Sequence, residues 1–372
     1  MNIAVIDAEI TGRTRHRFPN LCSMKISAYH KRRGDNVVLK TDFNCLDSFD
    51  RVYISKVFTK TVVPEDVLSM PNVTYGGTGF FYDKAPPLPE EIEHIMPDYH
   101  LYDEWVASRI SEGGALQEFK FYLDYSIGYL TRKCFRQCYY CVNRNYKRVE
   151  PGSALAEFYD PERPKICFLD DNFFGYPKWR ELIQPVLDTG RRFQFKQGLD
   201  ERLLNTEKIQ AIIDWKYDGE IIFAFDNIED EDLIISKLEL IRSTPGWNKA
   251  MKFYVFCGCD KNDVYDEEFW KRDIINLFHR IDILGRYGAL PYVMRFQKVY
   301  DTEYSSFYAT VAAWANQPAM FKKKTFRQLS VMRGTTKTGT KGASWRAMEE
   351  IERKFPEIAN KYYDRVMFIK HR

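Results

Sequence analysis

The chain has 372 residues, of which 45% are hydrophobic and 16% aromatic, and its formal net charge is +3. This composition supplies a sizeable core and excludes an intrinsically disordered chain. No apolar run approaches the roughly 20 residues that span a bilayer, and the start of the chain lacks a secretory pattern, so we expect a cytoplasmic protein with no membrane association.

Residues 1–82 are predicted to form a small Rossmann-like domain, because short apolar runs alternate with a helical run. The helix is expected over Leu21–Arg33, before Gly34. The run Gly76–Gly79 is interpreted as a turn that needs positive φ, or as a place where the backbone approaches a ligand. The expected parallel strands are Asn2–Val5, Asn36–Lys40, Arg51–Ser55 and 73–77.

A connector is expected over residues 83–119. Its first part, KAPPLPEEIEHIMPDYHLYDEW, is rich in proline and acidic residues. Because prolines resist continuous helix and sheet, we predict a segment that wraps the outside of the molecule or covers the mouth of the next domain.

Residues 120–300 are predicted to be an α/β core in which six strands alternate with helices. The expected strands are Tyr125–Thr131, Lys165–Asp170, Phe193–Gly198, Glu220–Phe225, Lys252–Cys257 and Pro291–Phe296. The expected helices between them include Lys178–Asp188, Thr206–Trp215, Asp230–Ile241 and Glu267–Leu284.

Residues 301–372 are expected to form a basic, mostly helical extension. From Phe321 to Arg372 there are 14 Lys and Arg against 5 Asp and Glu, a local charge of +9. This excess indicates either a solvated surface or a face for nucleic acid. The stretch RGTTKTGTKGAS (333–344) is predicted to be a mobile loop.

Three cysteines form the most informative motif. Cys134, Cys138 and Cys141 lie in CFRQCYYC, a C-x3-C-x2-C spacing that follows the strand-like YSIGYLT. Three thiolates at this spacing suit an iron–sulfur cluster and leave one iron of a [4Fe–4S] cube without a protein ligand. A zinc knuckle or buried core cysteines are the alternatives, but zinc needs a fourth ligand nearby and all six histidines lie far away in sequence.

This run, with the aromatic Tyr140 before its last cysteine, resembles the radical S-adenosylmethionine (radical SAM) superfamily. The resemblance implies a partial (β/α)6 TIM-type barrel with a [4Fe–4S] cluster on the three cysteines. It further implies that the open iron binds S-adenosylmethionine, and that an electron cleaves it to methionine and a 5′-deoxyadenosyl radical. A flavodoxin- or ferredoxin-like electron donor is implied as partner.

The N-terminal domain resembles the cobalamin-binding-type (B12-like) domain that precedes many radical SAM barrels. The cobalamin motif D-x-H-x-x-G is missing, since AEITG follows Asp7 and KRRG follows His30. We therefore expect no bound cobalamin. Methylthiotransferases carry three cysteines in a domain of this type, whereas this chain offers only Cys22 and Cys45, which argues against that activity.

Further contacts to S-adenosylmethionine are implied at the strand ends. The second core strand ends in Asp170, Asp171 and Asn172, where the family contacts the amino group; their oxygens can accept hydrogen bonds from an ammonium. The alternative is an Asp/Asn turn before the next helix.

The resemblance places other candidates at later strand ends. Arg202 suits the methionine carboxylate because its planar fork can bind both oxygens. The alternative for each candidate is an ordinary polar residue at the protein surface. Together with Tyr140, these cofactor-binding candidates are Gln197, Asp200, Arg202, Asp226, Met294 and Arg295.

Two more cysteines, Cys257 and Cys259, alternate along FYVFCGCD and are predicted to share one face of a strand. They could bind a second cluster or donate a hydrogen atom from a thiol. Packed core cysteines are the favoured interpretation.

The sequence thus predicts a radical SAM enzyme that abstracts hydrogen from its substrate. A nucleic acid base ranks ahead of a peptide or a small metabolite, because of the basic C-terminal segment. The alternatives are a radical SAM methyl- or methylthiotransferase and a non-catalytic protein with a structural metal site.

Overall fold

The structure is a computed structural model that describes residues 1–13 and 16–370. It is a mixed α/β protein with parallel sheets, which confirms the predicted fold class at that level. Contacts divide the chain into two compact units, Met1–Gln197 and Gly198–Arg372. The predicted boundaries at 82, 119 and 300 and the closure of the core strands into a barrel remain predictions.

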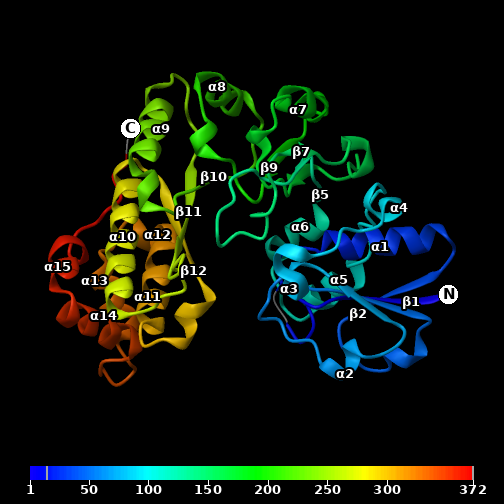
Figure 1. Cartoon of the computed structure of the whole chain (residues 1–372), viewed down its shortest axis with the longest axis horizontal. Coiled ribbons are helices and arrows are strands. Elements are labelled where there is room, and N and C mark those ends of the chain that lie inside the picture. The colour runs from blue at the N-terminus through cyan, green and yellow to red at the C-terminus, as the bar shows by residue number, and fades with distance from the viewer. Residues whose placement is uncertain (14–15, 371–372) are drawn as a thin grey trace. The chain divides into compact units, whose positions relative to one another are not determined.

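The N-terminal sheet has four parallel strands in the order β2-β1-β3-β4. Residues 3–7 of the central strand are completely buried. Helix α1 (Leu21–Arg32) packs on β1, β2 and β3 (Figure 1). It begins after Asn20, whose side chain accepts a hydrogen bond from the amide of Ser23 (3.1 Å). The strands are β1 (Asn2–Asp7), β2 (Asn36–Lys40), β3 (Arg51–Ser55) and β4 (Val73–Gly76), as predicted to within two residues.

The glycine-rich turn after β4 packs tightly against the backbone that follows β3. Gly77 has φ +106°, and a Cβ there would lie 2.3 Å from the carbonyl oxygen of Lys56. A Cβ on Gly79 would lie 2.5 Å from Cγ of Lys56. The predicted turn with positive φ is confirmed at Gly77, and the backbone of the run lies close to Lys56 of the chain itself.

The connector is part of the core. Tyr99, Tyr102 and Trp105 are buried in the same hydrophobic cluster as Ile3 of the N-terminal sheet and Tyr125 of the next one. The prediction of an outer wrapping segment is wrong for these residues, because the aromatic side chains that follow the prolines enter the core. The short helices up to residue 123 are α2 (Glu65–Leu68), α3 (Thr78–Phe81), the 3₁₀ turn η2 (Tyr82–Lys84), α4 (Glu90–Glu93), α5 (Asp103–Ser111) and α6 (Lys120–Leu123).

The first three predicted core strands form a parallel sheet in the order β5-β8-β9. A short antiparallel pair, β6 with β7, follows β5. Helix α7 contains Pro185 without interruption. The elements are β5 (Tyr125–Gly128), β6 (Thr131–Arg132), β7 (Glu150–Pro151), β8 (Lys165–Phe168), α7 (Trp179–Asp188) and β9 (Arg192–Phe195).

The last three predicted core strands form a second parallel sheet, β10-β11-β12, in the second unit. Helix α10 contacts β11 and β12 (Figure 1), and the side chain of Asp266 caps it by accepting from the amide of Phe269 (2.8 Å). The predicted helices are confirmed as well. The elements are α8 (Thr206–Asp214), β10 (Ile221–Ala224), α9 (Glu231–Ser243), β11 (Met251–Cys257), α10 (Glu267–Arg286) and β12 (Leu290–Arg295).

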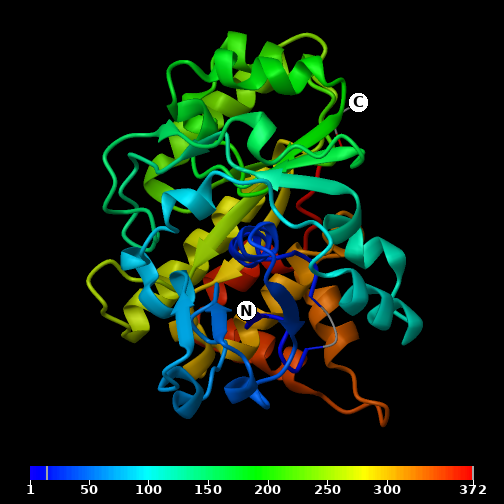
Figure 2. The ribbon, with the colours of Figure 1, turned by 90° about the vertical axis from the view of Figure 1, so that its right-hand side faces the viewer.

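The C-terminal extension is mostly helical, as predicted, and packs with α10 through buried aromatic rings such as Phe278, Trp314 and Phe326. The predicted loop 333–344 is shorter than expected: a β-bridge joins Thr335 to Lys341, and the turn between them projects from its two flanking helices (Figures 1 and 2). The helices are α11 (Ser305–Ala315), α12 (Pro318–Phe321), α13 (Phe326–Gly334), α14 (Ala343–Lys354), α15 (Pro356–Ile358) and the π-helical turn Ala359–Tyr363.

Among the described residues, no helix has both the length and the apolar character needed to cross a membrane.

Candidate functional site

The three cysteines lie on a loop whose base is closed by the β6–β7 pair. Arg132 of β6 pairs with Glu150 of β7, and the ammonium of Lys133 lies 2.6 Å from a carboxylate oxygen of Glu150. Lys133 and Gln137 have positive φ values of +70° and +51°. Two backbone reversals of this kind turn the chain sharply, so that the three thiols come from one short loop.

Amide groups point at two of the three sulfurs. The amide of Arg136 donates to Sγ of Cys134, and that of Asn143 donates to Sγ of Cys141, each at 3.4 Å. The side-chain amide of Asn172 donates to Sγ of Cys134 at 3.4 Å as well. Such bonds stabilise negative charge on sulfur and are among the features that tune iron–sulfur clusters.

The loop holds Cys141 as a neutral thiol. Burial raises the pKa of Cys141 to about 11; the amide of Asn143 opposes this shift, and the neighbouring Cys138 and Cys134 add to it. Binding of a metal centre at Cys141 would therefore have to displace the thiol proton.

The donor set fits an iron–sulfur cluster in chemical type, since it offers three thiols, two of which accept hydrogen bonds from amide groups. Within residues 1–13 and 16–370, no group of three or more His, Cys, Asp or Glu side chains is arranged so that it could hold a metal ion. The cysteines therefore remain predicted ligands.

Asp170, a predicted ligand contact, supports the loop from inside. It is 0% exposed and accepts hydrogen bonds from the amide of Leu130 (3.0 Å) and from the amide and hydroxyl of Thr131 (both 2.7 Å). Burial raises the pKa of Asp170 to about 7, against the opposing effect of these donors. With no exposed surface, its carboxylate orders the chain that leads into the cysteine loop.

Asp171 and Asn172 continue this support. Asp171 accepts from the amide of Lys133 (2.8 Å) and from the side chain of Asn143 (2.7 Å), so one carboxylate holds both ends of the cysteine run. Asn172 bonds to Sγ of Cys134. The parallel pairing of β5 with β8 makes these contacts possible, because the carboxyl ends of neighbouring parallel strands meet. This supporting role is one that the sequence reasoning missed.

The remaining candidates are divided between the two compact units. Gln197 is exposed at the end of the first unit. In the second unit, the guanidinium of Arg202 bonds to Asp200 (2.8 Å) and Asp230 (3.3 Å), so its fork is engaged by neighbouring carboxylates. The role of Arg202 as a carboxylate-binding fork therefore stays a prediction that would require these ion pairs to rearrange.

Three further candidates lie at or just beyond the ends of strands of the second sheet. A carboxylate oxygen of Asp226 accepts from the amide of Phe256 (2.9 Å), the carbonyl of Met294 accepts from the thiol of Cys257 (3.5 Å), and the guanidinium of Arg295 lies 4.8 Å from the ring centre of Tyr300. These contacts tie the ends of β10, β11 and β12 together.

Cys257 and Cys259 do not act as a matched pair in the structure. Cys257 is 2% exposed and lies on the buried face of β11 with Phe253 and Val255. Cys259 lies beyond the end of the strand and is partly exposed. For Cys257, the favoured interpretation as a packed core cysteine is confirmed.

The carboxyl ends of β1 and β3, where the strand order of the N-terminal sheet reverses, are covered by side chains of the chain. Asp7 accepts from the hydroxyl of Tyr102 (2.9 Å), and Asn20 donates to the hydroxyl of Ser55 (2.9 Å). Glu9 accepts from Thr61 and from backbone amides after β3. Open α/β sheets bind ligands at such a reversal of strand order, and in this chain a buried polar network occupies it.

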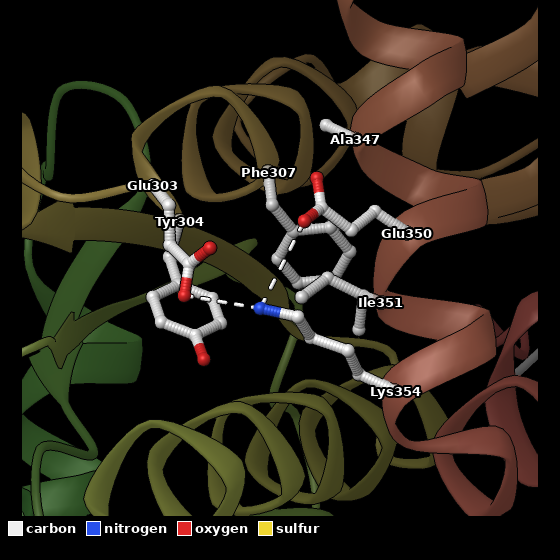
Figure 3. Close-up of a pocket in the computed structure, with 7 residues that line it drawn as sticks. All are labelled: Glu303, Tyr304, Phe307, Ala347, Glu350, Ile351 and Lys354. Atoms are coloured by element: carbon white, nitrogen blue, oxygen red, sulfur yellow. Dashed lines mark hydrogen bonds and ion pairs between the residues drawn. The ribbon is translucent and has the colours of Figure 1, made fainter. Parts of the chain in front are cut away.

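One small surface pocket lies in the second unit, and no predicted site residue lines it. Figure 3 shows the ammonium of Lys354 inside it, 3.0 Å from Glu303 and 3.8 Å from Glu350. The ion pairs of Lys354 fill this pocket, and it offers no chemistry of its own.

Two residues that the sequence analysis missed contact the cysteine loop. The hydroxyl of Tyr82 donates to the carbonyl of Tyr140 (2.5 Å), and Asp83 accepts from Arg144 (2.8 Å) and Asn145 (3.0 Å). No sequence signal marks them, because the contact joins segments about 60 residues apart.

Comparison with protein-family models finds none that matches this chain, and comparison with curated proteins finds no match either. The resemblance described above therefore depends on the cysteine run and on the elements around it.

Proposed function

We propose that this protein is a radical SAM enzyme whose [4Fe–4S] cluster is bound by Cys134, Cys138 and Cys141. The observation that carries the proposal is the C-x3-C-x2-C run, on a loop with amide donors to two of its sulfurs. When bound, the cluster would bind S-adenosylmethionine at its open iron and supply the electron that cleaves it to methionine and a 5′-deoxyadenosyl radical.

The chain's own part in this function is to position the loop. Asp170 orders the entry to the loop, Asp171 joins its two ends, and Asn172 bonds to the first sulfur. A loop held in this way needs little reorganisation when ligands bind, which lowers the free-energy cost of binding. Asp171, Asn172 and Tyr140 are proposed to face S-adenosylmethionine, with Gln197, Asp200, Arg202, Asp226, Met294 and Arg295 as further proposed contacts.

The proposed reaction begins with hydrogen abstraction from the substrate, and the electron comes from a flavodoxin- or ferredoxin-like donor. A nucleic acid base is the proposed substrate class, supported by the basic C-terminal segment Phe321–Arg372. All five acidic side chains after Phe321 form ion pairs, namely Glu349, Glu350, Glu352, Glu357 and Asp364.

The same segment contains more basic side chains than these ion pairs involve. Nine of them are exposed and form no ion pair with another described residue: Lys322, Lys323, Lys324, Arg333, Lys337, Arg346, Arg353, Lys361 and Lys370. Unpaired exposed cations of this number are what a polyanion requires for counterion release.

Metal analysis after anaerobic reconstitution with iron and sulfide tests the proposal. The expected result is about four irons and four sulfides per chain, lost in Cys134→Ala, Cys138→Ala and Cys141→Ala and retained in Cys45→Ala, whose thiol is exposed and remote in sequence. One zinc and no iron would instead support a structural metal site.

A methyl- or methylthiotransferase is the second candidate. It keeps the same three cysteines but forms S-adenosylhomocysteine or inserts sulfur. Purified protein that carries cobalamin or a second cluster would favour it over hydrogen abstraction.

A further inference from the structure

A segment of the N-terminal region contacts the cysteine loop directly. Thr78–Lys84, which comprises α3 and the 3₁₀ turn η2, follows the last strand of the N-terminal sheet. Its residues Tyr82 and Asp83 bond to the loop on the side of Cys141. No motif of the chain assigns these residues a function.

The anchor of this segment is rigid. The amide of Lys56 donates to the carbonyl of Gly76 (3.0 Å), and the amide of Gly79 donates to the carbonyl of Lys56 (2.9 Å). The hydroxyl of Thr78 donates to the carbonyl of Val57 (3.1 Å). Because Gly77 and Gly79 leave no room for a Cβ against Lys56, the segment begins at a fixed place on the carboxyl edge of the sheet.

The contact itself combines a neutral hydrogen bond with an ion pair. Tyr82 holds the carbonyl of Tyr140, the residue directly before Cys141. Asp83, whose side chain is 9% exposed, bonds to Nε and Nη2 of Arg144, each at 2.8 Å, while Nη1 of Arg144 reaches the carbonyl of Tyr139 (3.0 Å). The carbonyls before Cys141 and the guanidinium after it are thus both tied to this segment.

Tyr82 adopts an uncommon backbone conformation. Its φ is +47°, in a region that residues other than glycine rarely occupy. Strained residues of this type persist where the surrounding contacts determine them, and they concentrate at functional sites. The strain is consistent with a side chain that must reach the loop from a fixed anchor.

We propose that Tyr82 and Asp83 form a brace, anchored on the N-terminal sheet, that positions the carboxyl half of the cysteine loop. Both are positioning residues, since they act on Cys141 through Tyr140 and Arg144. The brace makes the order of the loop depend on the folded N-terminal sheet. Its importance for cluster binding depends on the proposed function, whereas its effect on the metal-free loop does not.

Amide hydrogen exchange on the metal-free full chain tests the brace. In Tyr82→Phe and in Asp83→Asn, the amides of Cys141, Asn143 and Arg144 should exchange about fivefold faster than in the parent, as expected for the loss of one hydrogen bond in the first variant and of the ion pair with Arg144 in the second. Tyr75→Phe is the matched control, because it removes a hydroxyl from β4 beside the anchor and should leave these rates unchanged.

A variant remote from the loop makes the test more stringent. Gly77→Ala displaces the anchor by forcing a Cβ against Lys56, and it should accelerate the same loop amides while the amide of Val5 in β1 stays protected. Protection at Val5 shows that the sheet is folded. Unchanged exchange at the loop in Tyr82→Phe and Asp83→Asn would overturn the brace.

Reconstitution separates this inference from the proposed function. If the parent binds a cluster, Tyr82→Phe and Asp83→Asn should lose iron to a chelator about fivefold faster and shift the electron paramagnetic resonance signal of the reduced cluster, while Tyr75→Phe matches the parent. Equal loss rates and identical spectra would contradict the brace. A parent that takes up no iron refutes the cluster alone, and the exchange rates of the metal-free chain still decide the brace.

Discussion

At the scale of single residues, the most informative outcome concerns Asp170, Asp171 and Asn172. The sequence located these polar side chains correctly at the end of the second core strand, because an apolar run followed by Asp-Asp-Asn is a clear strand end. It could not reveal that the side chains point to the cysteine loop, since that depends on the pairing of β5 with β8.

Asp171→Asn should weaken the loop. The NH2 group that replaces one carboxylate oxygen cannot accept a hydrogen bond, so one of the two bonds, to Lys133 or to Asn143, is lost. We expect a decrease in the free energy of unfolding of about 1–2 kcal/mol in urea, and less iron per chain after reconstitution. Glu162→Gln, at an exposed position, removes the same charge and should match the parent. Equal iron contents in Asp171→Asn and the parent would contradict the proposal that Asp171 holds both ends of the cysteine run.

The raised pKa of Asp7 should make the stability of the protein depend on pH. Burial raises the pKa of Asp7 to about 7, although the amide of Glu9 and the hydroxyl of Tyr102 oppose this, while the charge of Glu9 adds to it and that of Arg13 opposes it. The unfolded chain releases this proton near pH 4. Between pH 4 and 7 the native state therefore binds a proton that the unfolded state has lost, and its stability falls as the pH rises, by up to about 1.4 kcal/mol per pH unit.

Asp7→Asn should flatten this fall, because the amide does not titrate. Chemical unfolding at a series of pH values measures the slope, with Asp66→Asn at an exposed position as control. Parallel slopes for Asp7→Asn and the parent would show that Asp7 is ionised in the native protein.

At the scale of elements, strands and long helices were predicted closely and the aromatic connector was not. Strands such as Arg51–Ser55 and the helix that begins at Glu267 have the periodicity of buried faces, which is local information. Tyr102 and Trp105 follow a stretch rich in proline and acidic residues, so their burial reflects tertiary packing that overrides local composition.

Arg280 holds strand ends of the second unit together. It is 2% exposed, and its Nη1 donates to the carbonyls of Phe225, Asp226 and Phe256 at 2.8–3.0 Å. Arg280→Met leaves these acceptors without that donor, and we expect a loss of about 2–4 kcal/mol in the free energy of unfolding. Arg353→Met, on the exposed side of α14, should change it by less than about 0.5 kcal/mol. Similar stabilities for the two variants would contradict this role.

At the scale of the whole molecule, the division into two units falls at residues 197 and 198, inside the region that the sequence assigned to a single core. One hydrophobic cluster joins the N-terminal sheet, the connector and β5, so these segments fold as one body. Such sharing is invisible in the sequence, because each segment has the pattern of an ordinary amphipathic element. The cysteine run, in contrast, could be recognised from the sequence, because its spacing is a local feature.

The basic C-terminal segment Phe321–Arg372 yields a prediction about the substrate. Reversing Lys322, Lys323 and Lys324 to Glu, all exposed, should reduce retention of RNA or DNA and its salt dependence, because fewer counterions are released. Retention on nucleic acid columns at several salt concentrations measures this. The control reverses three exposed lysines of the first unit, Lys31, Lys60 and Lys147. Unchanged retention in the Lys322–Lys324 variant would contradict nucleic acid as the substrate class.

The measurement that tests the central claim most directly is the formation of 5′-deoxyadenosine. The reconstituted protein is incubated anaerobically with S-adenosylmethionine and dithionite, and the nucleoside products are quantified by mass spectrometry beside Cys141→Ala. A radical SAM enzyme predicts 5′-deoxyadenosine that depends on Cys141. A cluster-loaded protein that forms none, with or without pooled RNA, DNA and peptide, would contradict the account, and S-adenosylhomocysteine alone would assign the protein to methyl transfer.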